Sequence, residues 1–228
     1  MPEPATRVFT NLDHLVAELR RRRWREDFQK DHERLIHRDG FDLGPLSAIY
    51  ASVSSSTFRA FRSGHEWAPS TVFREWAGRR LSEGTMKDVL ALRSNEEYRT
   101  LALGLARNLE KDWKQRLHGP LQIPRALKLV NLLMKGLCVV CPVWPKRFGT
   151  LVWFLDVPLD KYSLRPLACI PKLANLGIRW NTATMGSVPD LRTYNHIQDS
   201  IHEACAKANV PAIAYDFLAW NLPHREVK

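Results

Sequence analysis

The segment ALKLVNLLMKGLCVV at residues 126–140 is apolar almost all the way round a helix of that length. A helix of this kind is typical of the centre of a helical protein, because a surface helix keeps one polar face. The three polar interruptions, Lys128, Asn131 and Lys135, are spaced i, i+3 and i+7 and therefore form one stripe. The segment predicts a central, buried helix that carries a single line of polar side chains.

Helical periodicity continues on both sides of this segment. Residues 11–36 repeat apolar side chains at helical spacing, and Asn11 is a suitable N-cap. Residues 150–155 favour extended structure but give no sign of a sheet. Further helices are predicted at residues 43–65 (a short one with a serine-rich turn), 70–81, 85–92, 95–113, 125–140, 160–169, 190–208 and 211–220. We therefore expect a mainly α, compact, multi-helix domain with little or no sheet.

The length of 228 residues suits one domain with a substantial hydrophobic core. The break at His118-Gly119-Pro120 divides an N-terminal helical half, residues 1–117, from a second half, residues 118–228. The net charge of +10 predicts a positive surface field that attracts polyanions, of which nucleic acid is the first candidate. Solubility alone is the alternative explanation of that charge.

The N-terminus lacks the pattern of a secretory signal, and four cysteines are few for a disulfide scaffold. We expect a cytoplasmic protein with reduced thiols, and no stretch predicts a membrane span. Cys138 and Cys141 form a single CxxC pair on an apolar helix, which favours two buried thiols over a zinc site. The sequence therefore predicts no metal and no cofactor.

Several basic residues are candidates for contacts with the phosphates of DNA. The arginines of the helix predicted at residues 11–36 wrap around it, so some of them are expected to be solvated only. The helix with the polar stripe adds two basic residues near its start. The candidate DNA-binding residues are Arg20, Arg23, Arg125 and Lys128.

Lys135 is the candidate nucleophile. A lysine held beside apolar surface loses solvation of its charged form, and a free amine attacks an electrophilic carbon and forms a Schiff base. The alternative is that the polar stripe faces solvent and that Lys128 and Lys135 extend their amines into water.

Two carboxylates follow Lys135 by about twenty to twenty-five residues. An amine nucleophile with a carboxylate suits cleavage of an N-glycosidic bond, because the carboxylate stabilises an oxocarbenium-like sugar or assists proton transfer. The spacing permits either Asp156 or Asp160 in that role. Asp160 has a second interpretation as the N-cap of the following helix, and the two roles are compatible.

These residues resemble the helix-hairpin-helix DNA glycosylases, and within them the archaeal 8-oxoguanine DNA glycosylase type. The resemblance covers about residues 118–221 and rests on KLVNLLMK (128–135), VPLD (157–160) and DFLAW (216–220), in that order. It implies a helical fold, a Schiff-base lysine at Lys135 and a catalytic aspartate at Asp160. The Leu-Pro-Gly hairpin and the iron–sulfur cysteines of related enzymes are absent from this sequence.

The same resemblance implies that Asp216 and Trp220 hold an extruded purine. Their spacing of one helical turn places both side chains on one face, where an indole can stack and a carboxylate can accept from the base. A core tryptophan with a surface aspartate is the alternative.

The expected function is that of a monomeric DNA glycosylase, with a possible lyase activity, that acts on duplex DNA with one nucleotide flipped out. A purine such as 8-oxoguanine or another modified base would be excised without a metal or cofactor. The alternatives are a non-catalytic nucleic-acid-binding module and a helical protein-interaction subunit with the same fold.

Overall fold

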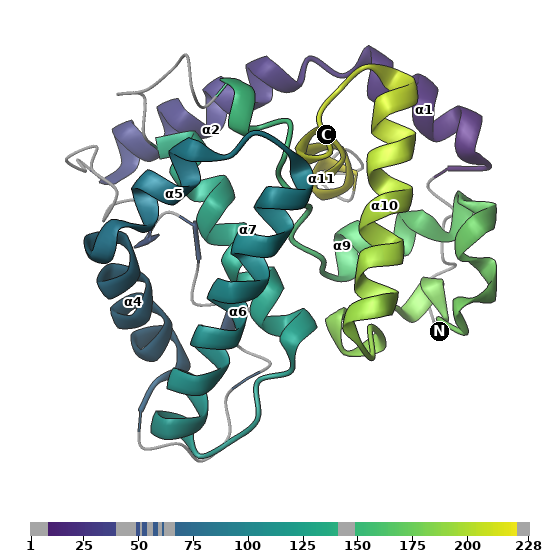
Figure 1. Cartoon of the computed structure of the whole chain (residues 1–228). Helices are drawn as coiled ribbons and strands as arrows, with labels where there is room; N and C mark the ends of the chain where they lie inside the picture. Colours follow the sequence, from purple (N-terminus) through teal and green to yellow (C-terminus); the bar gives the residue numbers. More distant parts are fainter. Residues whose placement is uncertain are drawn as a thin grey trace. The chain divides into compact units, whose positions relative to one another are not determined.

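The computed structural model describes residues 9–39, 49–50, 52–53, 57–58, 61, 67–140 and 149–222 (Figure 1). The regular secondary structure of these residues is helical and includes no β-strand, which confirms the mainly α fold. None of the helices in this part of the chain is long and apolar enough to cross a membrane. Most of the short helix predicted at residues 43–65 lies outside the described residues.

The chain forms two compact units. We call Arg25–Leu155 the α6/α7 unit, and Met1–Trp24 together with Asp156–Lys228 the α1/α10 unit. The predicted division at residues 117 and 118 does not follow these units, because the helices on both sides of that break pack together in the α6/α7 unit. A single domain over residues 1–228 stays a prediction.

The α6/α7 unit is built around a pair of long helices that a short connection joins. Figure 1 shows these two helices side by side. The first ends at Leu117, after which His118 adopts the left-handed conformation (φ 52°) and turns the chain. The helices that contribute to this unit are α2 (Trp24–Asp39), α4 (Pro69–Arg80), the π-helix η2 (Leu81–Thr85), α5 (Met86–Ala91), α6 (Asn95–Leu117) and α7 (Ile123–Val140).

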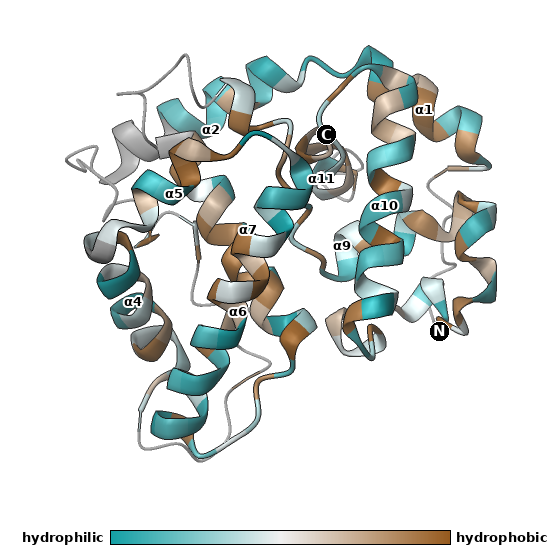
Figure 2. Ribbon diagram, in the orientation of Figure 1, coloured by the Kyte–Doolittle hydropathy of each residue, from teal (hydrophilic) through white to brown (hydrophobic). Residues whose placement is uncertain are grey.

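The core of this unit explains why α7 is apolar. Figure 2 colours α7 as hydrophobic over most of its visible length. Leu129, Val130 and Leu137 on α7 are completely buried, as are Trp76 on α4 and Tyr98 on α6. The burial of these large apolar side chains stabilises α7 more than the intrinsic helix propensity of its residues does. The prediction of a central, buried helix at residues 126–140 is therefore confirmed.

The α1/α10 unit joins the start of the chain to its last third. Leu15, Val16 and Leu19 form the buried face of the N-terminal helix, which packs on the long helix near the C-terminus. Between them the chain makes a series of short turns. The elements are α1 (Leu12–Arg21), α9 (Lys161–Leu164), the 3₁₀ helices η3 (Arg165–Cys169), η4 (Pro171–Leu176), η5 (Trp180–Thr182) and η6 (Met185–Ser187), α10 (Leu191–Ala208) and α11 (Ile213–Asn221).

Two parts of the predicted secondary structure differ from the structure. The helix predicted at residues 11–36 is two helices, since Arg22 is extended (φ −74°, ψ 126°) and its N–H donates to Leu19 O. Leu19 is the last residue of α1 that packs in the core, so nothing apolar holds the next turn in the same register. Residues 150–155 form a helical turn and a bend rather than extended structure.

Candidate active site

The polar stripe of α7 is partly buried. Asn131 is 1% exposed, and its Oδ1 accepts a hydrogen bond of 2.6 Å from the Tyr98 hydroxyl of α6. Lys128 and Lys135, on either side of it, are half-buried. The middle of the stripe therefore faces the neighbouring helix, and the interpretation of the whole stripe as a solvent-facing edge is wrong for Asn131.

Lys135 projects from the best-packed helix of its unit. Leu133, Met134 and Leu137, its neighbours along α7, are at most 1% exposed. The packing of α7 fixes the backbone position from which the Lys135 side chain extends. The half-buried position is compatible with a nucleophile and with a structural lysine.

Asp160 caps α9, which confirms its predicted structural role. Its Oδ1 accepts from the backbone N–H of Tyr162 (2.8 Å) and of Ser163 (3.1 Å). In return, the Asp160 N–H donates to Ser163 Oγ at 2.7 Å, which completes a capping box. Because the cap uses one carboxylate oxygen of a half-buried side chain, the capping role leaves Asp160 compatible with a second role.

Asp156 has a different environment. It is 3% exposed, and its Oδ1 lies 2.9 Å from Nε2 of His202 on α10. One turn earlier on α10, the buried Gln198 accepts from the Val157 N–H (3.0 Å) and donates to Val157 O (2.7 Å). Asp156 thus belongs to a buried clamp that fixes the strand-like segment before Asp160.

Sequence reasoning missed both Gln198 and His202. The signal available was their spacing of four residues on a predicted amphipathic helix, which places both on one face. That pattern does not identify the partner, because the partner is an extended backbone segment more than forty positions away. Only the folded structure brings the two together.

Trp220 and Asp160 lie on connected parts of the α1/α10 unit. Trp220 is 42% exposed, and its ring centroid lies 4.8 Å from that of Tyr162. The Lys161 amine lies 4.6 Å from the Tyr162 ring centroid. We call Lys161, Tyr162 and Trp220 the aromatic surface. Lys161 and Tyr162 directly follow Asp160 in the sequence, so a cation and an aromatic ring lie close to this carboxylate.

Asp216 is buried, whereas Trp220 is exposed. Asp216 is 1% exposed, although it lies one turn before Trp220 on α11. Of the expected pair, Asp216 thus lies in the interior of the unit and Trp220 at its surface. A base would have to enter the interior of the unit to contact the Asp216 carboxylate.

A buried cluster connects α11 to α9 beneath the aromatic surface. The Tyr215 hydroxyl donates to Ser163 O at 2.6 Å, and burial raises the pKa of Tyr215 well above its usual range. Burial also raises the pKa of Cys169 to about 11 and that of Cys205 to about 12. These thiols are therefore protonated at neutral pH and do not act as nucleophiles.

The candidate DNA-binding residues are distributed over both units. Arg20 donates from Nη2 to Lys207 O at 2.8 Å, at the C-terminal end of α10, so it has a structural contact. Arg23 is exposed, whereas Arg125 and Lys128 near the start of α7 are half-buried. Arg20 and Arg23 belong to the α1/α10 unit, and Arg125 and Lys128 belong to the α6/α7 unit.

Metal-ligating side chains do not cluster in the described part of the chain, where no three His, Cys, Asp or Glu residues gather. Cys138 is buried and is not in a disulfide bond. Its predicted CxxC partner, Cys141, lies outside the described residues, as does the loop at 142–148.

The positive charge of the chain is concentrated in residues 113–189. This third of the sequence has 11 Lys or Arg and 2 Asp or Glu, which accounts for +9 of the net +10. Its two carboxylates are Asp156 and Asp160. The two negatively charged residues in the most cationic part of the chain are thus the same two that are candidates for the catalytic carboxylate.

Comparison of the chain with protein-family models, with curated proteins and with solved structures finds no match.

Proposed function

We propose that this chain is a DNA glycosylase with an associated lyase activity, in which Lys135 is the nucleophile and Asp160 the assisting carboxylate. The observation that carries the proposal is the charge pattern of residues 113–189, where eleven cations accompany two carboxylates. Carboxylates repel phosphate, so the cations of a DNA-binding protein are accompanied by few of them. A carboxylate kept in such a region therefore calls for a specific role, either structural or chemical.

The two carboxylates divide between these roles. Asp156 is buried and paired with His202, which gives it a structural role that accounts for its presence. Asp160 is half-buried, caps α9 through one oxygen and adjoins the aromatic surface. We therefore assign the chemical role to Asp160.

The proposed reaction begins when the amine of Lys135 attacks C1′ of an extruded nucleotide. The bond between C1′ and the base nitrogen breaks, and the base leaves with the electron pair and takes up a proton. Asp160, as the carboxylate, stabilises the positive charge that develops on the sugar. The nitrogen, positively charged after the attack, gives up one proton to the departing base; the C1′–O4′ bond then breaks, O4′ takes up a proton from water, and a protonated imine forms between Lys135 and C1′.

The imine accounts for the lyase step. Loss of a proton from C2′ allows the 3′ phosphate to leave by β-elimination, and water then hydrolyses the imine and releases Lys135. On the substrate side, Trp220 would stack on the extruded base, and Asp216 would accept from a purine such as 8-oxoguanine.

Borohydride trapping tests the proposal. The protein is mixed with duplexes containing 8-oxoguanine, uracil or an abasic site, and the reduced adduct is quantified for the wild type, Lys135→Gln and Lys128→Gln. Lys128 is the matched control, since it occupies the same stripe of α7 and is also half-buried. Its predicted contact is with phosphate, so the yields are compared at duplex concentrations that saturate each variant. We expect Lys135→Gln to lower adduct yield by about 100-fold or more and Lys128→Gln to change it by about threefold at most. Duplex binding without an adduct on any substrate would instead indicate a non-catalytic DNA-binding module.

A second pair of variants distinguishes the roles of Asp156 and Asp160. Asn is as good an N-cap as Asp, so Asp160→Asn keeps the cap of α9 and removes the charge. We expect excision to fall by about 100-fold in Asp160→Asn and by much less in Asp156→Asn, once both are compared at equal folded fractions. The reverse order would assign the chemistry to Asp156.

A further inference from the structure

The turns between α9 and α10 carry cations and no carboxylate. Residues 161–189 contain four basic residues and no Asp or Glu over 29 positions. All four, Lys161, Arg165, Lys172 and Arg179, are exposed. The buried side chains of this segment, such as Leu164, Leu167 and Leu173, hold the turns against the core. The segment therefore presents its charge from a fixed backbone.

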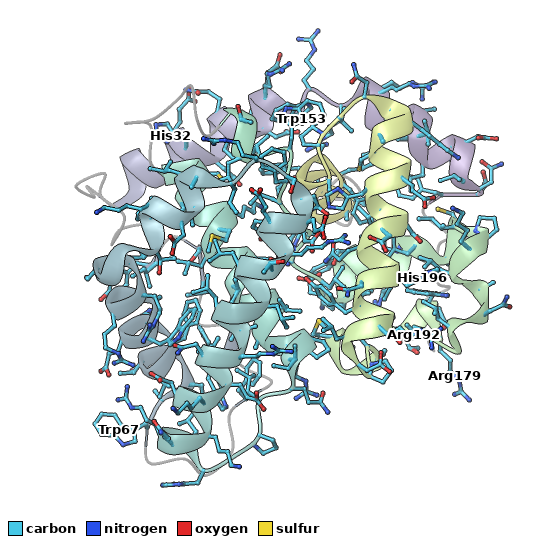
Figure 3. The ribbon with its side chains drawn as sticks, viewed as in Figure 1. His32, Trp67, Trp153, Arg179, Arg192 and His196 are labelled. Carbon is cyan, nitrogen blue, oxygen red and sulfur yellow. The ribbon has the colours of Figure 1, made fainter. Side chains whose placement is uncertain are left out.

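Packing of the turns gathers these cations with Arg192 and His196 of α10. η3, which begins at Arg165, packs against η5, which directly follows Arg179. η4 packs against α10, where His196 Nε2 lies 3.4 Å from Lys172 O. Arg192 lies one turn before His196 on α10 and is exposed. Figure 3 shows the side chains of Arg179, Arg192 and His196 at the surface of this unit.

Carboxylates neutralise only part of this charge. Glu203 pairs with Lys172 at 2.6 Å. Asp190 caps α10, and its pKa is lowered by the hydrogen bond from the Thr193 N–H and, to a lesser degree, by the charge of Arg192. Among the described residues, no ion pair engages Arg165 or Arg179. These two arginines keep their guanidinium groups available for an anion.

We infer that Lys161, Arg165, Lys172, Arg179, Arg192 and His196 form a surface, the basic turn surface, that binds the phosphodiester backbone of duplex DNA. The inference rests on the proposed function, since it supplies the phosphate contacts of the unit that holds Asp160 and Trp220. Arginine and lysine on fixed backbone are the usual partners of DNA phosphates. None of the exposed large hydrophobic side chains in the described residues lies in 161–189, and the exposed Trp220 adjoins the surface only at Tyr162, next to Lys161. Membrane-binding surfaces combine their cations with several inserted apolar side chains, so the observations favour DNA.

The test measures binding of a fluorescent duplex that contains a tetrahydrofuran abasic-site analogue, between about 50 and 300 mM NaCl. The variant is Arg165→Glu/Arg179→Glu. The control is Arg107→Glu/Lys111→Glu, which makes the same change in net charge at two exposed positions of α6. We expect the variant to bind at least about tenfold more weakly at low salt, with a salt slope smaller by about two, and the control to keep the wild-type slope. Arg165→Gln/Arg179→Gln replaces the variant if thermal unfolding shows that the reversal prevents folding.

Equal loss of affinity in variant and control would overturn the inference, because binding would then follow net charge alone. Tighter wild-type binding to double-stranded RNA or to anionic phospholipid vesicles than to the duplex would overturn the choice of partner. The Lys135→Gln protein, measured in parallel, keeps the two proposals apart. If it forms no adduct but keeps the wild-type salt slope, the chemistry depends on Lys135 and the basic turn surface is judged by its own variants. If the wild type also forms no adduct, the proposed function fails while the binding result stands.

Discussion

α7 and residues 156–187 are both held firmly, but by different means. α7 is a continuous helix whose apolar side chains fill the core of its unit, and Asn131 with its Tyr98 partner is one polar contact among many apolar ones. Residues 156–187 consist of an extended segment and short turns that depend on individual side chains, among them Gln198 and Tyr215. Because of this difference, we expect substitution of a single polar side chain to lower the free energy of unfolding much more in residues 156–187 than in α7.

The largest effect is expected for Gln198→Met, which keeps the volume and removes three hydrogen bonds, two of them to the Val157 main chain. The buried main chain of Val157 loses both of its hydrogen bonds to Gln198, so we expect a loss of about 3 kcal/mol in the free energy of unfolding. Asn131→Leu on α7 should cost about 1.5 kcal/mol, because it leaves the Tyr98 hydroxyl without this acceptor. Urea unfolding at neutral pH compares the two. Equal losses would remove the contrast between the regions.

High pH should also act on the α1/α10 unit. Burial raises the pKa of Cys205 to about 12 and that of Cys169 to about 11, so the folded state keeps these thiols neutral while the unfolded state ionises them from about pH 9. This contribution to stability is complete below pH 9 and is lost as pH rises towards 11 and 12. Each thiol should lower the free energy of unfolding by about 1.4 kcal/mol per pH unit in that window.

The matched protein for this measurement is Cys169→Ala/Cys205→Ala, studied by urea unfolding from pH 8 to 11. Its stability should fall less steeply with pH than that of the wild type, even though small cavities lower its stability at pH 8. An unchanged slope would show that groups other than these thiols govern the alkaline response.

The smallest effect concerns the cap of α9. Asp160→Ala removes the acceptor for the N–H groups of Tyr162 and Ser163 and should cost about 1 kcal/mol. Asp160→Asn keeps an acceptor and should cost only a few tenths of that. Thermal unfolding of the two variants measures the difference. If both lost the same stability, the charge rather than the cap would stabilise this end of the helix, and the Asn variant would no longer isolate the chemical role.

The parts of the fold that repeat with a regular period were predictable. Asn11 and Asp160 cap helices where the sequence placed them, since a cap depends on residues within one turn. The 3₁₀ turns η4, η5 and η6 were not predicted, because such short turns have no periodic signal and depend on tertiary packing, as η4 does on α10 and η5 on η3. The break after Arg21 was missed for a related reason, as it depends on where the core ends.

In the candidate site, too, the features set by local spacing were predictable and those set by tertiary packing were not. The stripe of α7 followed from spacing alone, but its contact with Tyr98 joins two helices and could not. The separation of Asp156 from Asp160 likewise depends on His202 and Gln198, which lie on a distant helix. Asp216 and Trp220 share a helical face by spacing, yet the packing around α11 buries one and exposes the other. Roles that depend on tertiary neighbours lie beyond what local patterns predict.

Mapping the covalent adduct by mass spectrometry tests the central claim, that Lys135 is the nucleophile, most directly. The wild-type protein is reduced with borohydride on an abasic duplex, treated with nuclease and digested with trypsin. A modified Lys135 resists cleavage, so we predict that the sugar remnant is found on a peptide covering residues 129–146. A remnant on Lys128, on Lys161 or on the N-terminal amine would contradict the assignment of Lys135, and with it the proposed mechanism.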